Sequence, residues 1–299
     1  MLKERIKYML NSPPWDYDYL MNLSDKELPL YLKGFFKLNT GENLNLRHPK
    51  TFNEKIQWLK IYDAIPIKSQ LTDKVYVRDY VKSKIGEKYL KPVLQICDSF
   101  DEIDFDKLPD KFVIKCAHGC KWQNVIKNKN VLLANEIMFK IVKDKFDTWM
   151  KLSFCVLGGM EMHYKNIVPR IIVEPLLREN ANELPIEYEV YCFNGVPKIY
   201  QKICYSFPRR VSVYDENYKN LNLKFLPEYQ LVNYPADEYM KQAVELSRKL
   251  ANDFKLVRID WMKYKDQLYF GEMTFTPFSG YYDFEDKKWN TILGNMLQI

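Results

Sequence analysis

Two carboxylates and a hydroxyl near the C-terminal end of the chain have the types and spacing of ligands for a hard metal ion. Residues 256–261 (LVRIDW) and 267–275 (QLYFGEMTF) are hydrophobic runs joined by a polar turn, which is typical of a β-hairpin. Asp260 lies in the first run. Glu272 and Thr274 lie two residues apart in the second and therefore share a face. These oxygen ligands predict a Mg²⁺ site; the alternative is a surface hairpin with ordinary charges.

Cations are expected beside this site. Arg258 lies two residues before Asp260, so its planar guanidinium is expected on the same face of the strand. Lys115 lies near the end of another β-rich run, 112–117, just before the bend at 117–120. A lysine in a buried strand needs an anion, and the backbone N–H groups of the bend suit a phosphate. The alternative for Lys115 is a side chain whose ammonium group simply reaches solvent.

Two further segments have features of a nucleotide site. Glu174, Pro175 and Leu176 end an apolar strand, a junction whose backbone can pair with the edge of a flat heterocycle while apolar side chains enclose the ring. Glu187 and Glu189 alternate on the next strand, so one carboxylate is a candidate for binding ribose hydroxyls and the other can face solvent.

Arg209 and Arg210 follow a predicted hairpin and are candidates for binding an acidic substrate, although a solvated pair explains them equally well. The sequence has only three histidines and no legible Ser/His/Asp or Cys/His arrangement, so a hydrolase with a protein nucleophile is not indicated. The spacing of Cys116, His118 and Cys120 resembles half of a zinc site. A structural zinc site usually has four ligands, and the sequence offers no second pair.

The elements that must position these residues alternate between helical and strand patterns. The α+β pattern, with mostly antiparallel sheets, indicates a helical N-terminal region over 1–70 and two further regions, 71–180 and 181–299. Asn194-Gly195 predicts a tight hairpin turn. The expected helices are 51–63, 71–85, 135–152 and 236–254, and the expected strands are 92–97, 112–117, 168–177, 188–193, 196–205 and the two runs at 256–275.

The composition is that of a globular protein, with 47% hydrophobic and 28% charged residues. The net charge of +6 suits anionic ligands such as nucleotides but does not indicate nucleic acid binding. The six cysteines have no framework spacing, and no stretch is long and apolar enough for a membrane span or signal peptide. We therefore expect a cytoplasmic protein with reduced thiols, whose basic, aromatic N-terminus makes at most peripheral membrane contact.

Taken in order, several motifs resemble the ATP-grasp superfamily, and specifically the TupA-like ATP-grasp family of surface-polysaccharide gene clusters. The resemblance covers most of the chain. It rests on LRHPKTFNEKIQWLKIYD (46–63), LTDKVYVRDYV (71–81), FVIKCAHGC (112–120), EMHYKNIVPRIIVEPLL (161–177), EYEVYCFNGVPKIYQ (187–201) and VRIDWMKYKDQLYFGEMTFTPFSG (257–280).

The resemblance implies an ATP-grasp fold, in which two α+β subdomains clasp ATP, and it assigns roles to individual residues. Arg258 and Lys115 become the catalytic cations. The implied ATP-binding residues are Lys74, Lys115, Gly119, Glu174, Pro175, Leu176 and Glu187, and the implied Mg²⁺ ligands are Asp260, Glu272 and Thr274. Two positions depart from the family pattern: the glycine loop is reduced to HGC, and Glu189 stands where the family usually has lysine.

The resemblance further implies an ADP-forming ligase that joins a carboxylate to an amine through an acyl phosphate. The expected substrates are a uronic acid of a capsular or other surface polysaccharide and an amino compound. Three alternatives stay open: a glycosyltransferase of polysaccharide biosynthesis, a kinase that uses the same ATP site, and a binding protein without activity. The sequence does not indicate an oligomeric state.

Overall fold

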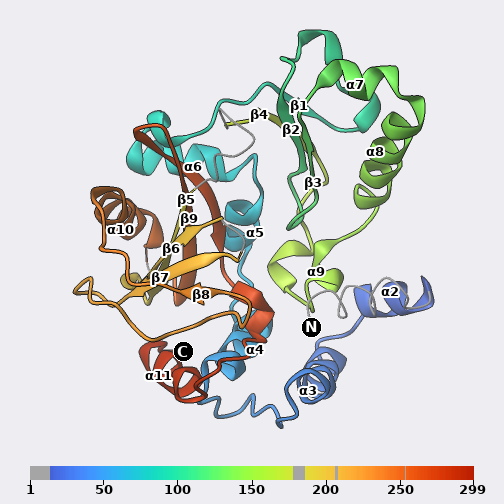
Figure 1. Cartoon of the computed structure of the whole chain (residues 1–299). Coiled ribbons are helices and arrows are strands. Elements are labelled where there is room, and N and C mark those ends of the chain that lie inside the picture. The colour runs from blue at the N-terminus through green and yellow to red at the C-terminus, as the bar shows by residue number, and fades with distance from the viewer. Residues whose placement is uncertain (1–13, 178–185, 206–207, 253) are drawn as a thin grey trace.

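Two β-sheets form the framework of the protein, and helices pack against both (Figure 1). The computed structural model describes residues 14–177, 186–205, 208–252 and 254–299. The α-helices are α2 (Pro14–Met21), α3 (Glu27–Thr40), α4 (Phe52–Tyr62), α5 (Pro66–Thr72), α6 (Val77–Ile85), α7 (Lys129–Ala134), α8 (Glu136–Trp149), α9 (Phe154–Leu157), α10 (Glu238–Ala251) and α11 (Lys288–Met296). The predicted α+β class and the helical N-terminal region are confirmed, since α2 to α6 precede the first strand.

The smaller sheet has the strand order β1-β4-β2-β3 and is antiparallel throughout. Its strands are β1 (Gln95–Cys97), β2 (Phe112–Cys116), β3 (Gln123–Ile126) and β4 (Ile171–Pro175). Ile114 and Val173 point to one face and pack with Phe146 of α8 in a hydrophobic cluster. Because side chains alternate along a strand, Lys115 and Glu174 lie on the opposite face.

The larger sheet has the strand order β10-β9-β5-β6-β7-β8. Its strands are β5 (Ile186–Phe193), β6 (Val196–Cys204), β7 (Arg210–Tyr214), β8 (Gln230–Leu231), β9 (Leu256–Tyr264) and β10 (Gln267–Thr274). All neighbours pair antiparallel except β7 and β8. The two predicted hairpins are confirmed: Asn194 and Gly195, with φ of 48° and 80°, connect β5 to β6, and Lys265, with φ of 52°, follows β9.

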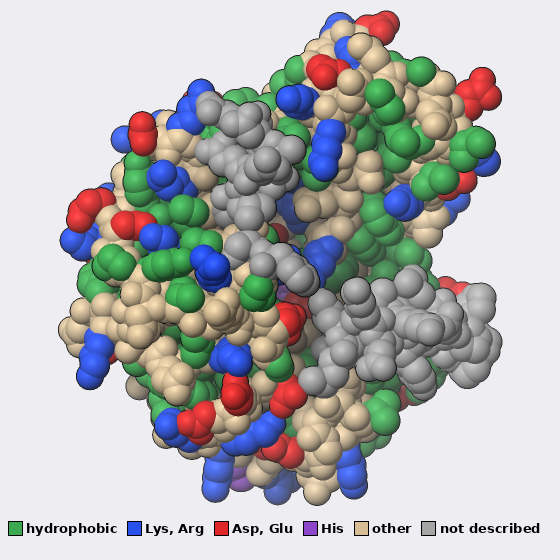
Figure 2. Space-filling model, viewed as in Figure 1, with side chains coloured by type: hydrophobic (Ala, Val, Ile, Leu, Met, Phe, Trp, Pro, Cys, Tyr) green, Lys and Arg blue, Asp and Glu red, His purple; other side chains and the backbone are tan. Residues whose placement is uncertain are grey.

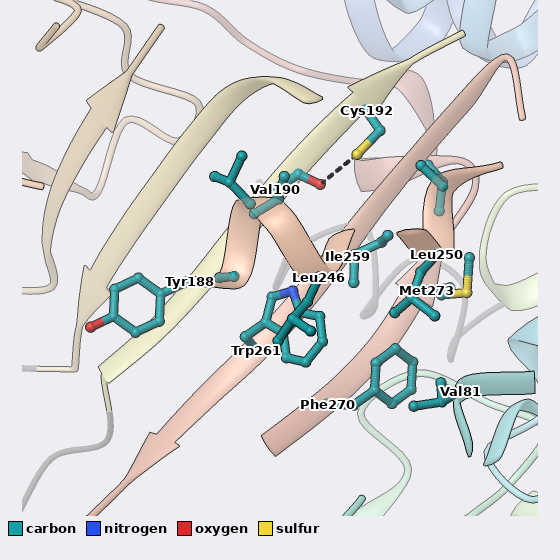
Figure 3. Close-up of a cluster of buried hydrophobic side chains, with 14 of the residues drawn as sticks. Val81, Tyr188, Val190, Cys192, Leu246, Leu250, Ile259, Trp261, Phe270 and Met273 are labelled. Atoms are coloured by element: carbon teal, nitrogen blue, oxygen red, sulfur yellow. Dashed lines mark hydrogen bonds between the residues drawn. The ribbon is translucent and has the colours of Figure 1, made fainter. Parts of the chain in front are cut away.

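One face of the larger sheet is apolar and packs against α10 and α6. Figure 3 shows Leu246 and Leu250 of α10 and Val81 of α6 meeting side chains of β5, β9 and β10. Trp261 is fully buried there, and its indole Nε1 donates to Ser247 Oγ at 2.8 Å. Burying so many large side chains fixes which face of each strand points inward.

The opposite face of this sheet is divided into an apolar and a polar part. The apolar part, which includes Phe193 and Leu256, is covered by α4 and α11. The predicted start of α4 is confirmed by a capping box, in which Thr51 accepts from the Glu54 N–H and the Glu54 carboxylate accepts from the Thr51 N–H. The polar part carries the predicted metal ligands and faces the smaller sheet.

Two predicted elements differ from the structure. The single helix expected over 71–85 is wrong, because α5 ends at Thr72 and α6 begins at Val77. Asp73 breaks the helix: its carboxylate accepts from the N–H of Val75 at 2.7 Å and also pairs with Arg170 at 2.9 Å. The strand expected from residue 92 begins only at Gln95.

Three further observations concern the chain as a whole. No helix in the described part of the chain is long and apolar enough to cross a membrane. The six cysteines are free; four are buried and two are partly exposed. The predicted boundary between residues 180 and 181 lies outside the described residues, and α6, from the predicted region 71–180, packs in the core of the larger sheet.

Candidate functional site

A row of four polar side chains crosses the larger sheet on the face opposite α10. Gln201 of β6 pairs with Glu189 of β5, Glu189 pairs with Asp260 of β9, and Asp260 pairs with Glu272 of β10. Directly paired residues of neighbouring strands place their side chains on the same face, about 5 Å apart at Cβ. The four residues, hereafter the cross-strand row, therefore present three carboxylates and one amide side by side.

Arg258 lies among these carboxylates and contacts three of them. Its Nε and Nη2 donate to the two oxygens of Asp260 at 2.7 and 2.6 Å, a bidentate pair. The same Nη2 is 3.7 Å from Glu272 Oε1, and Nη1 is 3.8 Å from Glu189 Oε1. Thr274 Oγ1 donates to Glu272 Oε1 at 3.3 Å. The structure thus brings Asp260, Glu272 and Thr274 together beside the guanidinium group of Arg258.

The donor set of this hairpin fits a hard cation. Asp260 and Glu272 supply carboxylates and Thr274 a hydroxyl, and phosphate oxygens and water can supply the remaining ligands of Mg²⁺. Both Asp260 oxygens are engaged by Arg258, so a cation would share this carboxylate with the guanidinium. Glu272 retains 35% of its side-chain surface exposed and remains accessible. Within the described residues, no group of three or more His, Cys, Asp or Glu side chains forms a metal site.

Lysines from the smaller sheet and from the break between α5 and α6 face the cross-strand row. Burial acts to raise the pKa of Glu272, but the charges of Lys74, Arg258 and Lys115 hold that pKa below its ordinary value. Lys74 Nζ donates to the carbonyl of Gly119 at 2.6 Å, and Lys115 Nζ pairs with Glu174 at 2.6 Å. Lys74 and Lys115 therefore both interact electrostatically with Glu272; the roles of these three residues in binding ATP and metal stay predictions.

Gly119 is packed against the ring of Trp122. A Cβ atom at position 119 would come within 2.2 Å of the indole, so the backbone needs glycine there for close approach. The same bend contains the half zinc pattern. Burial raises the pKa of the Cys116 thiol to about 12, and His118 Nε2 is 3.0 Å from the carbonyl of Trp149.

The junction at Glu174, Pro175 and Leu176 lies at the edge of this site. Glu174 and Pro175 pair with Val113 and Phe112 of β2, and the Leu176 N–H reaches the carbonyl of Lys111 at 3.5 Å. The carboxylate of Glu174 is used by Lys115. The role of this junction in binding adenine stays a prediction.

Lys91 is a cation of the site that sequence reasoning missed. Its backbone carbonyl accepts from Arg78 Nη2 at 2.9 Å, and its side chain, although partly exposed, lies among protein charges. Burial and the charge of Lys115 lower the pKa of Lys91 to about 8, opposed by Glu174, Glu187 and Glu272. Sequence reasoning could not single out Lys91, because lysines are numerous and Lys91 lies before the strand rather than in it.

The two arginines predicted to bind substrate, Arg209 and Arg210, have different neighbours in the structure. The guanidinium of Arg209 lies 4.6 Å from the ring centre of Tyr205, whose hydroxyl donates to Glu187. Arg209 also interacts electrostatically with Glu187 and so lies near the row. Arg210 is exposed and pairs in the sheet with Cys204. Within the described residues, only Arg209 of the two interacts with the acidic side chains of the site.

On the face drawn in Figure 2, a depression with Lys and Arg side chains along its walls lies between the part of the molecule that contains the smaller sheet and the part that contains the larger sheet. A separate surface hollow of about 690 Å³ lies between α4 and the C-terminal residues, where Arg47, His48 and Trp58 line it, and it contains none of the residues above.

The chain is similar to several solved structures of ligases. Among solved structures, the chain is similar to the D-alanine–D-alanine ligase of Bacillus anthracis complexed with ATP (13% identity, TM-score 0.41, 70% of this chain and 56% of that one). It is also similar to the Helicobacter pylori D-alanine–D-alanine ligase (13%, 0.45, 82% and 69%). A third is the ATP-grasp ligase PsnB with a precursor variant, Mg and ADP (10%, 0.41, 77% and 59%).

The chain thus spans less than two thirds of the length of two of these three proteins. The curated proteins gave no match. The family described as TupA-like ATPgrasp matches residues 54–298, which is most of the chain and includes every residue of the site. The protein therefore belongs to the TupA-like ATP-grasp family and has the ATP-grasp fold.

Proposed function

We propose that the protein is an ATP- and Mg²⁺-dependent ligase that joins a carboxylate to an amine. The observation that carries the proposal is the position of Arg258, which pairs with Asp260 and lies 3.7 Å from Glu272. The charges of Lys74 and Lys115 act on the same Glu272 carboxylate. Such a set of cations and oxygen ligands suits the transfer of a phosphoryl group from a nucleoside triphosphate.

The reaction needs no nucleophile from the protein. An oxygen of the acceptor carboxylate bonds to the γ-phosphorus of ATP, and the bond from that phosphorus to ADP breaks. The amine nitrogen then bonds to the carbonyl carbon, phosphate leaves with the former carboxylate oxygen, and the amine loses a proton. The protein positions the reactants and stabilises negative charge through Arg258, Lys115 and Lys74. A bound Mg²⁺, held by Asp260, Glu272 and Thr274, would neutralise phosphate oxygens.

The remaining assignments follow the same proposal. The backbone at Glu174, Pro175 and Leu176 binds adenine, Glu187 binds the ribose or the neighbouring substrate, and Gly119 closes over the phosphates. Arg209 and Arg210 are the candidates for an acidic group of the substrate, with Arg209 supported by its position beside Glu187. The acceptor is an acidic sugar of a surface polysaccharide, modified in the cytoplasm, where ATP is supplied.

The test is ADP release with Mg²⁺-ATP, glucuronate or galacturonate, and a panel of primary amines. A ligase releases ADP when both acid and amine are present, and hydroxylamine added in place of the amine traps the acyl phosphate as a hydroxamate. ADP release with the sugar alone, without hydroxamate, would instead identify a kinase. Thermal stabilisation by a nucleotide sugar but not by Mg²⁺-ATP would identify a glycosyltransferase.

A further inference from the structure

The β6 end of the cross-strand row has more hydrogen-bond acceptors than cations to satisfy them. Glu187 and Glu189 are two residues apart on β5 and lie on the same face, next to Gln201. Arg258 already makes its bidentate pair with Asp260, and Lys91 lies among Glu174, Glu187 and Glu272. The carboxylates of Glu187 and Glu189 and the amide of Gln201 thus lie near cations that already pair or interact with other carboxylates.

Glu189 is the more enclosed of the two carboxylates. It is 8% exposed, and its carboxylate accepts from Gln201 Nε2 at 2.9 Å. Its cationic neighbour Arg258 is 3.8 Å away, beyond hydrogen-bond distance. Burial raises the pKa of Glu189 although Arg258 opposes the shift. Because burial outweighs the charge of Arg258, a further cation beside Glu189 would stabilise its ionised carboxylate.

Gln201 supplies independent evidence for a missing donor. Its side chain is 1% exposed, and its Oε1 has no hydrogen-bond partner in the part of the chain that the structure describes. Its Nε2 donates to Glu189 and to Tyr191, which places the whole amide group against the Glu189 carboxylate. Exchanging the amide oxygen and nitrogen would put an oxygen against that carboxylate, which is unfavourable. Buried acceptors of this kind normally have a donor.

Glu187 extends the same acceptor surface. Its carboxylate accepts from the neutral hydroxyl of Tyr205, and burial raises its pKa, with a further contribution from the charge of Glu189. Arg209 stacks on Tyr205 and interacts with Tyr229, so its charge lies at the margin of the pair. Arg258 and Arg209 act on Glu189 and Lys91 acts on Glu187, yet burial outweighs these charges and raises the pKa of both carboxyl groups.

We propose that Glu189, Gln201 and Glu187 bind the amino group of the amine substrate as its ammonium ion. An ammonium group has three donors and no acceptor, which matches a carboxylate, a second carboxylate and an unpartnered amide oxygen. The proposal rests on the ligase function above and names which substrate binds where. The site sorts its substrates by charge: the ammonium at the β6 end of the row, and the anionic carboxylate and phosphates toward Arg258 and the lysines.

The experiment measures thermal stabilisation of the intact protein by ethanolamine, L-alanine, L-lysine and D-glucosamine, each at tens of millimolar and with NaCl-matched controls. We expect at least one amine to raise the melting temperature by about 2 °C or more, and its N-acetyl derivative to have no effect. Glu189→Gln should weaken the binding of that amine at least tenfold. Gln201→Leu should weaken it less, and it should lower the melting temperature of the protein without ligand, because the buried Glu189 carboxylate loses the Gln201 Nε2 donor.

Glu285→Gln is the matched control, because Glu285 forms an exposed pair with Lys224 on the surface. It should respond to amines as the natural protein does. Retained stabilisation by Mg²⁺-ATP shows that Glu189→Gln is folded and leaves the nucleotide site intact. The proposal is overturned if no amine stabilises the natural protein, or if Glu189→Gln responds equally. Failure of Mg²⁺-ATP binding or of hydroxamate formation would instead overturn the ligase function.

Discussion

At the scale of single residues, Arg258 has the largest effect on the site. It neutralises carboxylates from three adjacent strands, which would otherwise repel one another: Glu189, Asp260 and Glu272. A buried guanidinium with a bidentate partner is held in one orientation. The same residue therefore stabilises the fold and presents a fixed positive charge to a transferred phosphoryl group.

Replacing Arg258 by Ala should lower the free energy of unfolding by about 3–5 kcal/mol at pH 7.5, because it leaves carboxylates buried without their cation. The loss should shrink toward pH 4, where the carboxylates of the variant become protonated. Urea denaturation at both pH values measures this. The exposed Arg248→Ala, whose guanidinium is 3.8 Å from Glu245, should cost less than about 1 kcal/mol. A loss below 1 kcal/mol in Arg258→Ala would contradict the assignment.

Lys91 gives a prediction about pH. Its pKa is lowered to about 8, and a bound phosphate would stabilise its charged form. The protein without ligand loses this charge as the pH rises through 8, so the affinity for Mg²⁺-ATP should fall between pH 7.5 and 9.5. Isothermal titration at both pH values should show the fall in the natural protein and a smaller one in Lys91→Met. An equal fall in both would mean that Lys91 does not contact the nucleotide.

At the scale of elements, a β-bulge in β10 determines which side chains of β9 and β10 lie side by side. β9 and β10 pair as Trp261 with Phe270, but Asp260 then pairs with Glu272, because Gly271 is an extra residue. Without this bulge Asp260 would lie opposite Gly271. Glu272 would point to the apolar face that packs against α10. Asp260 and Glu272 lie side by side because β10 contains one additional residue.

Gly271→Ala tests the bulge. A Cβ atom at position 271 would lie 2.8 Å from the carbonyl oxygen of Asp260, so the strand must shift. We expect a loss of about 1–3 kcal/mol in unfolding free energy and a larger relative loss of turnover, since Asp260 and Glu272 move apart. Gly34→Ala, inside α3 with open space around it, should instead gain about 0.5–1 kcal/mol. Unchanged activity in Gly271→Ala would show that the register is not critical.

At the scale of the whole molecule, a buried polar junction joins parts that are distant in the sequence. Lys60 Nζ donates to the carbonyl of Gly159 at 2.7 Å, and Thr276 donates to Glu161. His163 lies in the same junction, 2% exposed, with its ring centre 5.9 Å from that of Phe275. The junction connects α4, the turn before β4 and the segment after β10, so its integrity is a property of the entire fold.

This junction predicts sensitivity to acid. Burial, together with the charges of Lys68 and Lys60, lowers the pKa of His163 to about 3. The unfolded chain, with an ordinary histidine pKa near 6.5, binds the proton more readily, so stability is present above that value and is lost as the pH falls. The contribution lost by pH 5 is about 2 kcal/mol. His163→Phe should lose correspondingly less stability between pH 7.5 and 5, and the exposed His48→Gln should behave like the natural protein.

Much of the fold follows from local pattern. Alternating hydrophobicity identified the β9–β10 hairpin, the Asn194-Gly195 turn and the parity of Arg258, Asp260, Glu272 and Thr274, because a strand with one buried face has only one workable arrangement. The helix expected over 51–63 is observed as α4 for a similarly local reason, since a cap at Thr51 precedes it. These features depend on neighbours in the sequence, and so the sequence by itself determined them.

Tertiary structure decided what local pattern could not. Asp73 breaks the helix expected across Lys74, and it does so partly through Arg170, nearly a hundred residues away. Gln201 reaches Glu189 only because of a bulge near Tyr191; the tight turn alone would place Tyr200 there. Bulges and long-range ion pairs depend on the balance of packing across the whole sheet. Which carboxylate Arg258 holds, and which acceptors remain open for a ligand, was therefore settled only when the strands assembled.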